Sequence, residues 1–137
     1  MSASPITGCS VIVFEQKKVL LIKRGKQPYR GCWSLPGGSQ ELGETLEECA
    51  RRELKEETCL DAGRLEFAAV RDRISRNEDG YPDYHFVLTT FFTTSFTGEA
   101  MAGDDAVNLG WFGLEEMREL STTPETVEFV REVLKSR

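Results

Sequence analysis

The chain has 137 residues and a formal net charge of −6 at pH 7, with 39% hydrophobic and 29% charged residues. These values are typical of one globular domain and exclude wholesale disorder. The acidic balance argues against a non-specific grip on nucleic acid polymers, and no run approaches the roughly 18 apolar residues of a membrane span. We therefore expect one domain over residues 1–137, and a cytoplasmic location because the N-terminus lacks the pattern of a secretory signal.

The first half of the chain contains a predicted hairpin, a loop and a helix. Residues 9–15 and 18–24 are β-branched runs separated by a short polar stretch, which predicts a β-hairpin. Residues 25–38 are rich in Gly and Pro and are expected to form an ordered loop that ends in a tight turn. Residues 45–60 are helical in pattern, and Thr45 with Glu48 predicts a capping box at the start of this helix.

The second half alternates strands, loops and helices. The pattern predicts strands at 64–74, 84–96 and 108–114, loops at 76–83 and 97–106, and helices at 114–120 and 124–137. Several strands with one helix early and two late predict an α/β fold, with a mixed sheet covered by helices on its faces.

The helix at residues 45–60 carries carboxylates on its apolar side. A helical projection places Glu53 and Glu57 within the stripe formed by Leu46, Cys49 and Ala50. The other charges of the helix fit an ordinary solvated face with ion pairs. Burying two like-charged carboxylates one turn apart is costly unless a positive charge compensates them. A divalent cation suits this role, because Mg²⁺ prefers oxygen ligands and keeps waters for a phosphate substrate.

The same segment resembles the Nudix box, which is Gly, five residues, Glu, seven residues, and then Arg-Glu-aliphatic-x-Glu-Glu-x-Gly-aliphatic. The chain matches this register at Gly38, Glu44, Arg52, Glu53, Leu54, Glu56, Glu57 and Leu60. The flanking stretches WSLPGG and GWFGLEEMREL also resemble the family, so the similarity runs from about residue 8 to residue 120. It implies an α/β/α sandwich with a mixed β-sheet between helices, hydrolysis of a nucleoside diphosphate linked to another group, and Mg²⁺ or Mn²⁺ as cofactor.

Site roles follow from the resemblance by position. The implied metal ligands are Glu53, Glu56, Glu57 and the carbonyl of Gly38, and the implied catalytic residues are Glu53, Glu56, Arg52 and Glu44. Arg52 is expected to pair with a box glutamate such as Glu44 and to orient the ligands. The general base stays open between a box glutamate (Glu53 or Glu56) and an acid of the later loop (Glu99, Asp104 or Asp105).

Four further residues are candidates for substrate binding. Arg24 ends the second predicted strand, where a guanidinium can meet a phosphate with two hydrogen bonds. Lys26 and Arg30 follow in the next loop, and His85 is the only histidine, although a place in the core or at a sheet edge would explain it equally. The aromatic residues are expected in the core and not as a stacking platform for a base: Tyr84, Phe86, Phe91, Phe92 and Trp111.

Cys59 stands where the family has glycine. A glycine at the end of a helix usually adopts a left-handed conformation, which costs a cysteine roughly 1 kcal/mol. No histidine-bearing motif lies near Cys59, so we do not expect a nucleophile there. The four cysteines match no zinc spacing and are expected to be reduced.

Several functions stay open at this point. The substrate class includes nucleoside triphosphates, nucleotide-sugars, ADP-ribose and dinucleoside polyphosphates. The ADP-ribose subclass tends to carry a proline about sixteen residues after the box, where this chain has Arg76, and its later segments look more like the small members of broad specificity. The alternative is a catalytically weak domain that senses a nucleotide or binds a partner, although such domains usually lose box glutamates that this chain retains. A structural Ca²⁺ site lacks the required Asp-rich spacing, and a homodimer is possible.

Overall fold

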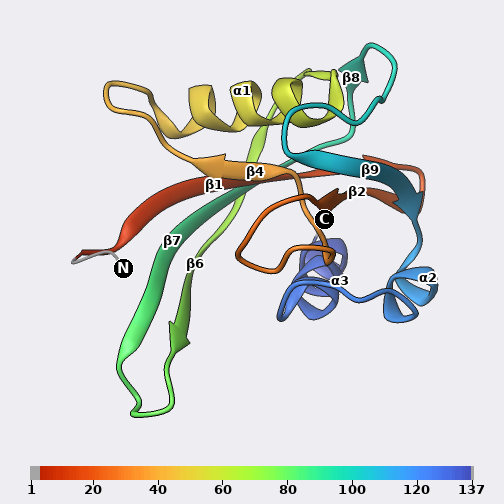
Figure 1. Ribbon diagram of the computed structural model, residues 1–137. Coiled ribbons are helices and arrows are strands. Elements are labelled where there is room, and N and C mark those ends of the chain that lie inside the picture. The colour runs from red at the N-terminus through yellow and green to blue at the C-terminus, as the bar shows by residue number, and fades with distance from the viewer. Residues whose placement is uncertain (1–3, 137) are drawn as a thin grey trace.

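The computed structural model describes residues 4–136, which fold into a mixed β-sheet with helices on both faces (Figure 1). The elements in chain order are β1 (Ile6–Glu15), β2 (Lys18–Arg24), β3 (Trp33–Ser34), β4 (Gly37–Ser39), α1 (Leu46–Thr58), β5 (Asp61–Ala62), β6 (Glu66–Arg76), β7 (Pro82–Thr93), β8 (Phe96–Thr97), β9 (Ala106–Phe112), α2 (Leu114–Arg118) and α3 (Thr126–Ser136). The predicted sandwich is confirmed. Among these residues, no helix has the length and apolar character needed to cross a membrane.

β1 lies at the centre of the sheet, which has the strand order β3-β2-β1-β7-β6. β1 runs antiparallel to β2 and to β4, and parallel to β7 from the pair Ile6–Phe86 to the pair Val13–Thr93. β9 pairs with β2 on the other side, while β5 and β8 form a separate two-stranded sheet. The central strand therefore joins segments that are far apart in the sequence.

The two faces of the sheet bury two different apolar clusters, because side chains alternate along a strand. Cys9, Val11 and Val13 of β1 pack with Leu54 and the other buried residues of α1. Ile12 and Phe14 point to the opposite face and pack with buried residues of α2 and α3. The helices therefore cover opposite faces, as Figure 1 shows, and α1 is fixed against β1 by its apolar side.

α1 begins and ends as the sequence predicts. The Thr45 side chain accepts a hydrogen bond from the Glu48 amide, and the Glu48 carboxylate accepts one from the Thr45 amide. Cys59 ends the helix in the left-handed conformation, with φ of 66°. All four cysteines are free thiols, as expected.

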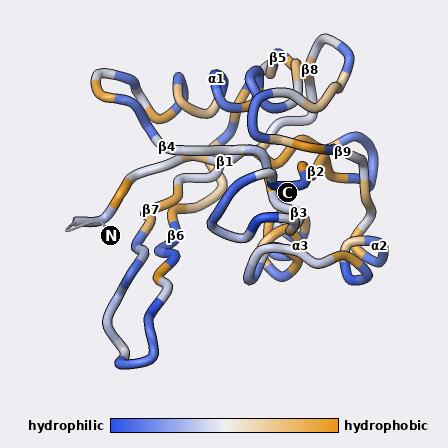
Figure 2. Tube along the Cα trace, viewed as in Figure 1, coloured by the Kyte–Doolittle hydropathy of each residue, from blue (hydrophilic) through white to orange (hydrophobic). Residues whose placement is uncertain are grey.

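The boundaries of several elements differ from the predictions. Part of the expected loop at residues 25–38 forms β3 and the start of β4, and Gly37 and Gly38 allow β4 to lie close to β1. β6 and β7 continue into the expected loop at residues 76–83, leaving only a tight turn at 77–81. Figure 2 shows that this end of the hairpin extends beyond the rest of the sheet and is largely hydrophilic, which explains why the sequence pattern resembled a loop.

Candidate active site

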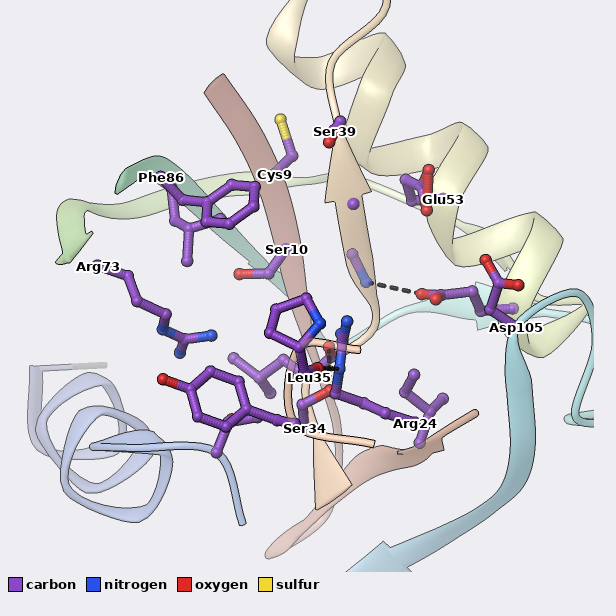
Figure 3. A pocket seen from close by; sticks show the side chains of 18 of the residues that line it. Cys9, Ser10, Arg24, Ser34, Leu35, Ser39, Glu53, Arg73, Phe86 and Asp105 are labelled. Carbon is purple, nitrogen blue, oxygen red and sulfur yellow. Dashed lines mark hydrogen bonds between the residues drawn. The ribbon is translucent and has the colours of Figure 1, made fainter. Parts of the chain in front are cut away.

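A cavity of about 580 Å³ opens between α1 and the β6–β7 hairpin. One side of it is formed by Glu53 and Glu57 of α1 together with β4, and another by side chains of β6 and β7. The loop from Gly25 to Tyr29 and the pair Asp104 and Asp105 complete the wall. Figure 3 shows Glu53 and Arg73 on opposite sides of this cavity.

The acidic side of the cavity contains one buried carboxylate, Glu57, and one partly buried carboxylate, Glu53. Glu57 is 5% exposed, and one of its oxygens accepts a hydrogen bond of 2.7 Å from the Gly37 amide. Burial raises the pKa of Glu57 to about 8, although the Gly37 amide opposes the shift, and the neighbouring Glu53 charge adds to it. Burial likewise raises the pKa of Glu53, and here the Arg52 guanidinium opposes it. Both acids thus lie in surroundings that favour an added positive charge.

Arg52 holds the remaining acids of the box. Its guanidinium donates to both oxygens of Glu44, at 2.5 and 2.9 Å, and to Glu53 at 2.8 Å. It also donates to Glu56 at 3.0 Å. The expected pair with Glu44 is therefore present, and the Arg52 hydrogen bond lowers the pKa of Glu44 to about 2. Arg52 fixes the side chains that flank the buried acids.

The site fits a hard divalent cation by its chemistry. The three acids Glu53, Glu56 and Glu57 offer oxygen donors only, and a side chain added at Gly38 would collide with the Glu53 carboxylate, so glycine keeps this space open. Within residues 4–136, however, no three acidic, Cys or His side chains converge on one point. Arg52 binds Glu53 and Glu56, and Glu57 binds Gly37, which separates the carboxylates in this arrangement.

The Gly38 carbonyl, the expected fourth metal ligand, is directed toward α1. Its oxygen accepts a hydrogen bond from the buried Cys49 thiol at 3.8 Å and lies close to Gly8 of the facing strand. The paired β4–β1 backbone fixes that direction. The role of this carbonyl as a fourth ligand stays a prediction.

Two of the three loop acids reach the cavity. Asp104 and Asp105 line it, whereas Glu99 does not. Asp105 forms a 2.7 Å ion pair with Lys26, so both side chains are engaged with each other. Backbone hydrogen bonds from Gly103 to the carbonyl of Glu57, and from Met101 to that of Thr58, hold this loop against the end of α1.

The opposite wall contains residues that were not predicted as a site. Arg71, Arg73 and Ser75 of β6, and Tyr84, Phe86 and Leu88 of β7, line the cavity. The rings of Tyr84 and Phe86 stack at 6.3 Å with an angle of 11° between their planes. The expectation that these two aromatic residues belong to the core is wrong, because both point to the cavity. Every second residue of β6 (71, 73, 75) and of β7 (84, 86, 88) lines the cavity, because side chains on one face of a strand repeat every two residues. This spacing was the sequence signal that these side chains lie on one face.

The four predicted substrate-binding residues divide into two groups. Arg24 and Lys26 line the cavity, and Arg24 donates from Nε to the Pro28 carbonyl at 2.7 Å. Arg30 is exposed and is not part of the lining. His85 lies on the other face of β7 and contacts Asp72 at 2.9 Å. Strand alternation is the physical reason, because Tyr84 and Phe86 on either side of His85 take the cavity face.

Comparison with known proteins gives the class. Residues 5–133 match the family model of the NUDIX domain, and the chain therefore belongs to the Nudix hydrolases. A crystal structure of a MutT NUDIX hydrolase from Burkholderia pseudomallei superposes with a TM-score of 0.82 at 30% identity, covering 96% of this chain and 97% of that one. The fold and the box are thus those of an established hydrolase class.

Two curated relatives carry substrate names. An ADP-ribose pyrophosphatase of Methanocaldococcus jannaschii is 36% identical over 123 residues, which cover 90% of this chain and 70% of that protein. A putative 8-oxo-dGTP diphosphatase of Bacillus subtilis is 36% identical over 106 residues, which cover 76% of this chain and 64% of that protein. The two relatives differ in the group attached to the nucleoside diphosphate.

Proposed function

We propose that this protein hydrolyses the diphosphate linkage of a nucleoside diphosphate derivative in a reaction that depends on a divalent metal, with ADP-ribose as the first substrate to test. The observation that carries the proposal is the cavity itself, which joins the buried acids of α1 to a wall of arginines and aromatic rings. Similarity to the ADP-ribose pyrophosphatase supports ADP-ribose, even though the proline at position 76 is absent.

Glu53, Glu56 and Glu57 are the residues that would hold Mg²⁺ or Mn²⁺. When bound, the ion neutralises diphosphate charge and makes an attacking water more acidic. Arg52 and Glu44 position these ligands through the hydrogen bonds already described. Arg24 lines the cavity with a guanidinium that uses only Nε in binding Pro28, so its other nitrogens are placed to bind a phosphate oxygen.

Asp104 is the loop acid that we propose as the general base. It lines the cavity, and its charge raises the pKa of both Glu53 and Glu57, so it faces the same volume as they do. Asp105 is held by Lys26 and Glu99 lies outside the lining. Proton removal by Asp104 would leave the box glutamates free for the ion.

The test is product release from ADP-ribose, 8-oxo-dGTP and a nucleotide-sugar, with and without Mg²⁺. We expect metal-dependent cleavage of a P–O–P linkage. We also expect kcat to fall roughly 100-fold or more in Glu53→Gln, Glu57→Gln and Asp104→Asn. Glu47→Gln is the matched control, because Glu47 is an exposed acid of the same helix that pairs with Arg51.

A different result would indicate the other class of function. If no compound of the panel is hydrolysed but one of them raises the thermal unfolding temperature in the presence of Mg²⁺, the protein is a nucleotide sensor and not a hydrolase. Equal losses in Glu47→Gln and Glu53→Gln would show that the box acids act through helix stability and not through chemistry.

A further inference from the structure

The wall opposite the acids carries an arginine pair that the reaction at Glu53 and Glu57 does not use. Arg71 and Arg73 lie two residues apart on β6 and point to the same cavity, because side chains on one strand face repeat every second residue. Figure 3 shows the Arg73 guanidinium turned into the cavity across from Glu53. Both side chains are half-buried.

Neither arginine has a carboxylate partner within residues 4–136. No ion pair joins Arg71 or Arg73 to an acid, and Nε of Arg71 is buried without a hydrogen bond. Glu125 is the acid whose charge acts on both, but it is exposed. Buried or half-buried arginines are normally paired, since an unpaired charge loses its hydration without compensation.

Repulsion between the neighbouring guanidinium groups adds to the free-energy cost of leaving both arginines without an acid partner. Burial lowers the pKa of Arg71, and repulsion by Arg73 lowers it further. Burial also lowers the pKa of Arg73, where Tyr29 and Glu125 oppose the shift and the Arg24 charge adds to it. Arg24, Arg71 and Arg73 all line the same cavity.

Arg71 is also held in place. Its guanidinium carbon lies 3.7 Å from the centroid of the Phe129 ring on α3, a cation–π contact that fixes the guanidinium plane. Thr123 and Thr126, next to the start of α3, line the same part of the cavity. An ordered guanidinium without an acid partner is suited to bind an oxyanion with two hydrogen bonds.

A phosphate fits this arrangement better than a base edge or a sugar. A neutral acceptor would leave the repulsion between two adjacent guanidinium groups uncompensated, whereas a phosphomonoester brings a charge of nearly −2 and three acceptor oxygens. Figure 3 shows Arg73 across the cavity from Glu53, the side on which the proposed ion and the scissile diphosphate would bind. An anion at the arginine pair would therefore be a group other than the scissile diphosphate.

We propose that Arg71 and Arg73 form a second anion subsite, which binds a phosphomonoester of the substrate in addition to its scissile diphosphate. The role of this subsite in catalysis rests on the proposed function, but its ability to bind phosphate does not. The preferred substrate is then a nucleoside diphosphate derivative that carries one more phosphate group.

The first experiment measures binding of inorganic phosphate by calorimetry in EDTA, so that no metal contributes. We expect saturable binding to the wild type and a Kd about tenfold higher in Arg71→Gln and in Arg73→Gln, since each loses a charged hydrogen bond. Arg64→Gln is the matched control, because Arg64 is exposed near the start of β6 and outside the cavity lining, and its Kd should equal that of the wild type.

The melting temperature of each variant shows whether a weaker phosphate affinity is caused by a folding defect. Without phosphate, replacement of an unpaired guanidinium should leave the melting temperature unchanged or raise it, and a given phosphate concentration should stabilise Arg71→Gln and Arg73→Gln less than the wild type and Arg64→Gln. Absence of saturable binding, or the same Kd in all four proteins, would overturn the subsite.

The second experiment compares ADP-ribose with ADP-ribose that carries a further phosphate, either on the 2′-hydroxyl of the adenosine ribose or on the 1-hydroxyl of the terminal ribose. We expect roughly tenfold higher kcat/KM for one phosphorylated form in the wild type, and equal values in Arg73→Gln. Equal kcat/KM values for all three compounds in the wild type would show that the subsite does not take part in substrate recognition. If phosphate binds as expected but neither these three compounds nor the 8-oxo-dGTP and nucleotide-sugar of the earlier panel are hydrolysed, the proposed function fails and the subsite stands.

Discussion

Glu57 combines burial, a carboxylate and a single backbone hydrogen bond, so its ionisation should make the stability of the fold depend on pH. Its pKa of about 8 in the folded protein lies above the roughly 4.3 of an unfolded chain. Between these values the folded state binds more protons than the unfolded state, so the free energy of unfolding decreases as pH rises through this window. Below about pH 4 both states are protonated, and the loss is complete above the folded pKa.

Glu57→Gln should therefore stabilise the metal-free protein above about pH 8, by on the order of 5 kcal/mol at most. The amide oxygen of glutamine can still accept the Gly37 hydrogen bond, so packing is retained. Urea denaturation in EDTA at several pH values measures the effect. A wild type whose stability does not change between about pH 5 and pH 8 would contradict this account of Glu57.

Cys59 is a second residue with a defined conformational cost. Its φ of 66° lies in the region that glycine adopts freely, so Cys59→Gly should raise the free energy of unfolding by up to about 1 kcal/mol. Turnover should remain within a few-fold, because the side chain is not part of the cavity lining. Chemical denaturation and kcat on the same preparation test both statements, and a large loss of kcat would give the thiol a chemical role.

Prediction from sequence worked best for residues with a fixed register. The helical projection placed Glu53 and Glu57 in the buried stripe, and the structure gives Glu57 an exposure of 5%. It failed for Tyr84, Phe86, Arg71 and Arg73, because strand alternation does not say which face is the core and which is a cavity. Hydrophobicity alone assigned the aromatic pair to the core.

The contact between β4 and α1 is the element-scale feature on which the acidic side of the cavity depends. A Cβ at residue 38 would meet the Glu53 carboxylate, and β4 cannot move away because it pairs with β1. Gly38→Ala should therefore displace Glu53 and lower kcat by roughly 10-fold or more, as changes in ligand support do. Gly43→Ala is the comparison at a site with open space, although its φ of 86° adds local strain.

A fall in kcat for Gly38→Ala could come from displacement of Glu53 or from a less stable fold, and urea denaturation distinguishes the two. If Gly38→Ala unfolds at the wild-type urea concentration and only kcat falls, the Glu53 position is responsible. A wild-type kcat in Gly38→Ala would show that the carboxylate tolerates the methyl group.

Short strands were the elements that sequence could not predict. β3 and β4 span two and three residues, and β4 contains two glycines, so neither has a pattern of its own. They form because β2 and β1 offer edges for pairing. By contrast, the capping box and the hairpin turn are local signals, and both α1 and the β1–β2 pair appear where they were expected.

At the scale of the whole molecule, metal binding and folding should be linked through pH. If a cation binds Glu53 and Glu57, it competes with the proton that Glu57 retains up to about pH 8. A fixed Mg²⁺ concentration should raise the melting temperature more near pH 9 than near pH 6. Scanning calorimetry with Ca²⁺-free Mg²⁺ and an EDTA reference measures the difference, and the Glu57→Gln variant should abolish most of it.

The parallel pairing of β1 with β7 also sets the order in which the protein can be completed on the ribosome. β1 leaves the exit tunnel well before its partner β7, which ends at Thr93, and the Ser10–Thr90 hydrogen bond joins residues 80 positions apart. The acidic helix is therefore synthesised before the strand that closes the opposite wall. A nascent chain that stops before β7 would display its carboxylates without a cavity, and the cavity would be completed only when β7 joins the sheet.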